Sequence, residues 1–80
     1  MTILIKNRQF MFSVFEREDR YYMTAVAGGV AQYDVTIILS PEEVATFQQD
    51  ENKAIATAKD LITRTQAYES RLVTPSLDPE

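Results

Sequence analysis

Alternating apolar and polar positions predict three β-strands in the first half of the chain. Aromatic and β-branched residues recur at every second position, the period at which the side chains of a strand share one face. The predicted strands are residues 9–17, 21–27 and 31–39. Turn-like sequences separate them, so we expect an antiparallel meander. Residues 2–6 are also mostly apolar, and the pattern leaves open whether they extend the first strand or form a separate one.

The residues after the third strand carry the signals of a helix N-terminus. Ser40 is a favourable N-cap, and Pro41 suits the first helical position because its missing N–H is not needed there. Glu43 follows Ser40 at the spacing of a capping box, in which each residue accepts a hydrogen bond from the backbone N–H of the other. We therefore expect a short helix over residues 41–48.

A longer second helix is predicted over residues 50–71, because apolar residues recur there at three- and four-residue spacing behind a plausible N-cap, Asp50. Whether the two helices are continuous stays open. Residues 74–80 are polar and contain two prolines, so we expect a disordered tail. The sequence thus predicts a single compact α+β domain over residues 1–73. Its architecture is a three-stranded antiparallel β-meander followed by a short and a long α-helix packed on one face.

The pair Gly28-Gly29 is interpreted as a two-residue hairpin loop, because glycine accepts the positive φ angles that such a loop requires. With this loop Ala27 faces Val30, and Tyr22 faces Val35. The face that this register turns to the core comprises Tyr22, Val26, Tyr33, Val35 and Ile37. The first strand adds Phe10, Phe12 and Val14 to that face only if an odd number of residues, three or five, separates the first two strands.

The same register leaves a second sheet face that also carries large apolar side chains. One layer of helices covers only one side of a sheet, so this face stays partly exposed, is covered by the first helix or the tail, or packs on a partner. We expect the last of these, a homodimer. The candidate interface residues are Met11, Phe15, Tyr21, Met23, Asp34 and Ile38.

The composition removes several kinds of chemistry. The 80 residues include no cysteine and no histidine, which excludes disulfides and thiolate metal sites and removes the commonest general base. Gly28-Gly29 is followed by a predicted strand and lacks the lysine and hydroxyl residue of a phosphate-binding loop. The acids and arginines of residues 16–20 are typical of a solvated turn. We therefore expect no catalytic residues, no cofactor and no metal, and a protein that is not an enzyme.

The charge balance also limits the possible partners. The formal net charge is −4, and no basic helix face emerges, so we expect no nucleic acid partner. No apolar run approaches the length of a membrane span, and the first residues do not resemble a signal peptide. We expect no membrane partner and a cytoplasmic location.

These observations favour a small, acidic, non-catalytic protein that acts through protein–protein interaction, as a homodimer. Two alternatives stay open at this point. One is an inhibitor or immunity-type protein whose acidic helices bind a basic partner. The other is a small-ligand binder or enzyme whose site forms between subunits, near Tyr21, Met23 and Asp34.

Overall fold

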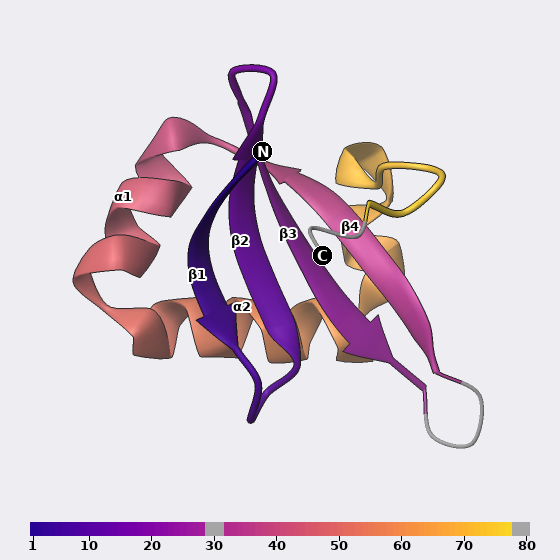
Figure 1. The fold of residues 1–80 in the computed structure, drawn as a ribbon. Coiled ribbons are helices and arrows are strands. Elements are labelled where there is room, and N and C mark those ends of the chain that lie inside the picture. The colour runs from indigo at the N-terminus through magenta and orange to yellow at the C-terminus, as the bar shows by residue number, and fades with distance from the viewer. Residues whose placement is uncertain (29–31, 78–80) are drawn as a thin grey trace.

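A computed structural model describes residues 1–28 and 32–77 (Figure 1). Within these residues the chain forms a four-stranded antiparallel sheet in the order β1-β2-β3-β4, followed by two α-helices and a 3-10 helix, η1. The elements are β1 (Thr2–Asn7), β2 (Phe12–Arg17), β3 (Arg20–Ala27), β4 (Tyr33–Leu39), α1 (Pro41–Gln49), α2 (Glu51–Thr63) and η1 (Thr65–Arg71). The predicted α+β class is confirmed, whereas the prediction of three strands and two helices is incomplete.

The additional strand is β1, which pairs with β2 along the edge of the sheet. The pairing is irregular, because Ile3 lies opposite Phe15 but Ile5 lies opposite Val14. This β-bulge turns Ile3 to one face of the sheet and Ile5 to the other. Asn7 ends the strand on the helix side, where its side-chain amide donates a hydrogen bond to Glu51 of α2 at 2.8 Å.

The β2–β3 turn is shorter than the sequence pattern suggests. Arg17 pairs with Arg20, so Glu18 and Asp19 alone form the loop, and the predicted odd-numbered loop is wrong. Both loop residues have positive φ angles, 54° and 65°, as a turn that matches the twist of the two strands requires. This turn places Val14 opposite Met23.

The register between β3 and β4 also differs from the prediction. Tyr22 lies opposite Ile38 instead of Val35, a shift of three residues, and the last pair is Ala27 with Tyr33. The predicted pairing of Ala27 with Val30 and part of the Gly28-Gly29 loop lie outside the described residues. Gly28 itself has a positive φ angle of 93°.

These two corrections reverse the faces of β3 alone. Met23 and Ala25 are fully buried toward the helices, whereas Tyr22 and Val26, which were predicted to face the core, point to the opposite side. The predicted inward residues of β2 and β4 are largely correct. Both loops differ from their predicted lengths by an odd number of residues, so the second error restores on β4 the faces that the first one exchanged on β3. Tyr33 is the exception, with 58% of its surface exposed at the start of β4.

The helices begin where the sequence predicts, but the second one ends early. The capping box between Ser40 and Glu43 is confirmed. Asp50, in an extended conformation, separates α1 from α2, and its side chain accepts a hydrogen bond from the backbone N–H of Asn52. The predicted helix over residues 50–71 is wrong in its last third, because α2 ends at Thr63 with Arg64 as its C-cap, and η1 follows.

The core lies between one face of the sheet and the helices α1 and α2. In Figure 1 α2 crosses behind the strands and α1 lies at the left, beyond β1. Small side chains of α2, Ala54 and Ala58, let this helix approach β3 closely. No helix among the described residues is long and apolar enough to cross a membrane. The buried core residues are Phe12, Val14, Met23, Ala25, Ala27, Val35, Ile37, Leu39, Val44, Phe47, Ala54, Ala58 and Leu61.

The substitution Asp19→Gly tests the two-residue turn. Glycine adopts the positive φ angle of this position without the steric cost that a side chain carries, so we expect stabilisation by about 0.5–1 kcal/mol in urea unfolding. Arg20→Gly, one residue further inside β3, serves as the control and is expected to destabilise. Equal destabilisation by both substitutions would contradict the left-handed turn.

Candidate functional site

The side of the sheet that faces away from α1 and α2 is called the outer face. It holds three of the residues that the sequence suggests for an interface: Phe15, Asp34 and Ile38. Tyr21 and Met23 lie on the helix side instead, where Met23 is fully buried and Tyr21 packs against the core. Met11 precedes β2 in a left-handed conformation and is exposed.

A row of apolar side chains crosses the outer face from edge to edge. The apolar row consists of Ile3, Phe15, Tyr22 and Ile38, which are successive pairing partners on β1, β2, β3 and β4. The Phe15 and Tyr22 rings stack with their centroids 5.5 Å apart. Phe15 is completely shielded from solvent, whereas Ile3 and Ile38 at the two ends are 41% and 37% exposed. The helices α1 and α2 pack on the opposite face of the sheet.

A row of hydroxyl side chains lies two residues away from the apolar row along β2, β3 and β4. The hydroxyl row consists of Ser13, Thr24 and Thr36, which are again successive partners on β2, β3 and β4. All three are buried, and the Thr24 and Thr36 hydroxyl oxygens are 2.7 Å apart. Residues 72–77, here called the returning segment, lie beside this row. Leu77 makes backbone hydrogen bonds to both threonine hydroxyls.

The returning segment includes part of the predicted disordered tail. Residues 76 and 77 hydrogen-bond to β4 and to the hydroxyl row, and residues 78–80 lie outside the described residues. The sequence pattern allowed for a tail on this face but did not single out Thr24, Thr36 or Leu77. The signal that could have identified the threonines is their opposition on β3 and β4, which becomes visible only in the correct register.

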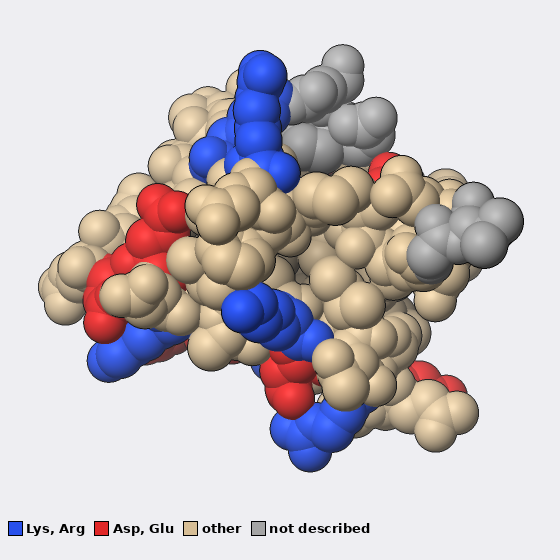
Figure 2. Space-filling model, turned by 90° about the horizontal axis from the view of Figure 1, so that it is seen from below, with Lys and Arg blue, Asp and Glu red and all other residues tan. Residues whose placement is uncertain are grey.

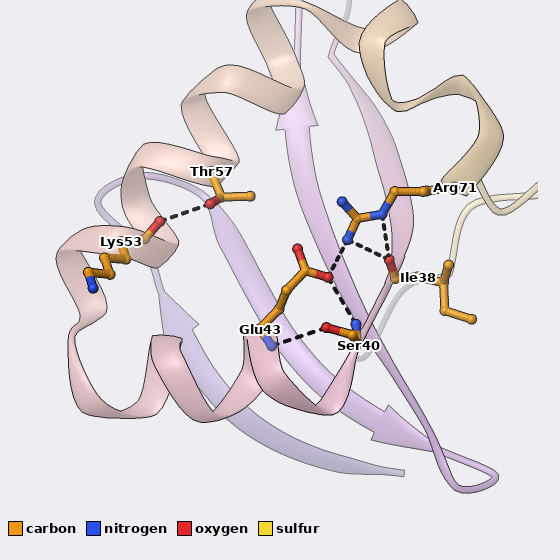
Figure 3. Close-up of polar contacts among 6 residues, drawn as sticks. All are labelled: Ile38, Ser40, Glu43, Lys53, Thr57 and Arg71. Atoms are coloured by element: carbon orange, nitrogen blue, oxygen red, sulfur yellow. Dashed lines mark hydrogen bonds and ion pairs between the residues drawn. The ribbon is translucent and has the colours of Figure 1, made fainter.

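A polar junction holds the start of the returning segment in place (Figure 3). The Arg71 guanidinium, at the end of η1, donates hydrogen bonds to the Ile38 backbone carbonyl at 3.0 and 3.2 Å and to the Glu43 carboxylate at 2.5 Å. The same carboxylate oxygen accepts a hydrogen bond from the backbone N–H of Ser40. Arg71 thus joins η1 to the end of β4 and to the first turn of α1.

The surroundings of Glu43 act on its pKa in opposite directions. Partial burial raises the pKa, but the hydrogen bonds from Arg71 and from the Ser40 backbone outweigh it. The pKa of Glu43 therefore lies below its ordinary value of 4.5, and the carboxylate stays ionised opposite Arg71.

A second ion pair lies at the junction of α2 and η1. Arg64 donates two hydrogen bonds to the Asp60 carboxylate at 2.7 and 2.9 Å, and the Tyr68 hydroxyl donates a third at 2.6 Å. These bonds lower the pKa of Asp60 from 3.8 to about 2. Burial and the bond to Asp60 raise the pKa of Tyr68, so its hydroxyl remains a donor.

Each of these two carboxylates is paired with an arginine, and among the described residues no three acidic side chains converge as a cation site would require. Seen from below, acidic and basic side chains of the described residues are interspersed without a broad area of one sign (Figure 2). The outer face is therefore the strongest candidate site.

The charges at the two ends of the outer face differ in sign. Arg17 and Arg20 pair beside the β2–β3 turn, and strand alternation places both on the outer face, exposed to solvent. Asp34 lies at the opposite end, also exposed. The apolar and hydroxyl rows separate these ends, so the face has a basic end, an uncharged centre on β2–β4 and an acidic residue.

Comparison with protein-family models, with curated proteins and with solved structures found no significant match to this chain.

The pair of Asp60 and Arg64 leads to a prediction about acid stability. A lowered folded-state pKa means that this carboxylate stabilises the fold above its unfolded-state pKa, near 3.8, and loses that contribution as the pH falls toward about 2. We expect Asp60→Asn to lower the free energy of unfolding at neutral pH and to become equal to the wild type in strong acid, as measured by urea unfolding at several pH values. A difference between the two proteins that does not change with pH would contradict this role.

Proposed function

We propose that the protein is a non-catalytic interaction protein that forms a homodimer through its outer face. The apolar row is the observation that supports this proposal. A sheet face that is solvated throughout carries polar side chains, whereas this row has a buried aromatic centre and exposed isoleucines, Ile3 and Ile38, at both ends.

The arrangement of the row suits a two-fold contact between copies. In such a dimer the same residues of both chains meet, and two sheets pack face to face about 10 Å apart. A two-fold axis that runs across the strands places the apolar rows near each other. It also brings Arg17 and Arg20 of one copy toward Asp34 of the other, so the charges at the ends favour this orientation.

The other functions receive less support. A ligand site near Tyr21, Met23 and Asp34 requires these residues to converge, but the first two lie on the helix side of the sheet and Asp34 lies on the outer face. An inhibitor with acidic helices requires available carboxylates. Two of the helical carboxylates, Glu43 and Asp60, are already bound by Arg71 and Arg64, which leaves fewer acids such as the exposed Glu42 for a basic partner.

The substitution Ile38→Glu tests the proposed dimer. We expect the wild type to sediment as a dimer at tens of micromolar in analytical ultracentrifugation, and the variant to sediment as a monomer. A carboxylate at this position places charge inside the apolar contact, where desolvating it is costly. Because the side chain is already 37% exposed, the monomer itself is expected to fold.

The matched control is Tyr33→Glu, which changes an exposed residue of the same strand on the other side of the sheet. It is expected to leave the dimer intact. A monomeric wild type at this concentration, or equal loss of the dimer in both variants, would overturn the proposal.

A further inference from the structure

The returning segment follows the outer edge of β4. Leu72 forms a bridge with Ile37, and the backbone N–H of Val73 donates a hydrogen bond to the Thr36 carbonyl at 2.9 Å. The Ser76 hydroxyl donates to the Asp34 carbonyl at 2.7 Å. The segment thus uses the outward-facing carbonyls of β4, which an added strand would also use.

Beyond Ser76, one residue of the segment is held by two side chains of the sheet. The Leu77 N–H donates to the Thr36 hydroxyl oxygen at 3.0 Å, and the Leu77 carbonyl accepts from the Thr24 hydroxyl at 2.8 Å. If Thr36 donates to Thr24 across the 2.7 Å that separates them, every hydroxyl donates once and accepts once. The four groups then form a closed ring of hydrogen bonds, which strengthen one another.

The threonine pair is positioned by the sheet. Thr24 and Thr36 are direct partners on β3 and β4, and they are 6% and 1% exposed. What they bind is the N–H and the C=O of a single residue, the two groups that every non-proline residue of an extended peptide offers. The chemistry of this site is therefore recognition of main-chain N–H and C=O groups, supplemented by the edge of β4.

We propose that Thr24, Thr36 and the outer edge of β4 form a main-chain binding site that residues 72–77 of a second copy occupy in exchange for the chain's own segment. The second copy is the chosen partner because its segment can make every contact that the chain's own segment makes, so exchange between copies loses no hydrogen bond. The site also adjoins the apolar row on the outer face, two residues away along β2, β3 and β4. The choice of partner rests on the proposed dimer.

Two full-length variants separate the two halves of this contact. Leu77→Pro removes the N–H that binds Thr36 but keeps both threonine hydroxyls, so this chain, the acceptor, has a weakened segment and a complete site. Thr24→Val with Thr36→Val removes the hydroxyls but keeps Leu77, so this chain, the donor, has a complete segment and a weakened site. Circular dichroism first establishes that both variants fold.

Mixing the two variants is expected to give a complex between unlike chains, measured by native mass spectrometry of mass-tagged protein. In a second mixture the donor, the chain with Thr24→Val and Thr36→Val, also carries Leu77→Pro. The dissociation constant of the first complex should be lower than that of the second by about tenfold or more, because a net hydrogen bond contributes about that factor. Thr74→Ala on the donor is the matched control, since Thr74 is exposed, and it should leave the complex unchanged.

Equal affinity in both mixtures would overturn the proposal. A fluorescent peptide with the sequence of residues 72–77, added to the Leu77→Pro chain, tests the site by itself. Capture of the peptide without any complex between chains would overturn the choice of a second copy as partner. The apolar row is unchanged in every mixture. If the dimer tested with Ile38→Glu does not form, all mixtures are affected equally. Failure of this site instead removes only the difference in affinity between the mixtures.

Discussion

The left-handed turn at Glu18 and Asp19 determines which side chains of β3 face the helices. Because neighbouring residues of a strand point to opposite faces, one additional residue in this loop would exchange the two sets completely. With the loop as it is, Met23 and Ala25 fill the space beneath α2, and Tyr22 and Thr24 are left for the outer face. The apolar row and the hydroxyl row both follow from this register.

Features encoded over a few adjacent residues could be predicted from the sequence. The Ser40–Glu43 capping box needs only four consecutive positions, and the alternation within β4 correctly separates Ile37 from Ile38. Pairing between strands was harder, because it depends on loop length. Gly28-Gly29 indicated a two-residue loop, but Ala27 and Tyr33, the last pair of β3 and β4, are separated by five residues. For the candidate site, strand alternation found Phe15, Asp34 and Ile38, whereas the wrong register substituted Tyr21 and Met23 for Tyr22 and Thr24.

The early end of α2 shows how tertiary contacts override a local pattern. Apolar and hydroxyl residues continue at helical spacing through Thr65 and Tyr68, and a 3-10 helix has nearly the same spacing, so the sequence offers no stop signal. In the structure the Thr65 hydroxyl donates to the Leu61 carbonyl, and Tyr68 bonds back to Asp60. The change of helix type allows Arg71 to reach both Ile38 and Glu43. The contacts of Arg71 connect positions that are far apart in sequence, which a reading of local pattern cannot detect.

The bulge in β1 has a consequence for how large an assembly of this protein can become. An exposed, regular edge strand is a template on which further chains can pair without limit. Here the β4 edge is occupied by Leu72 and Val73, and the bulge between Ile3 and Ile5 interrupts the regular spacing of the β1 edge. Strand-by-strand growth into a continuous sheet is therefore opposed at both edges. In the proposed dimer, association through the outer face uses that surface up once two copies have met, so it ends in a closed pair and not in a fibre.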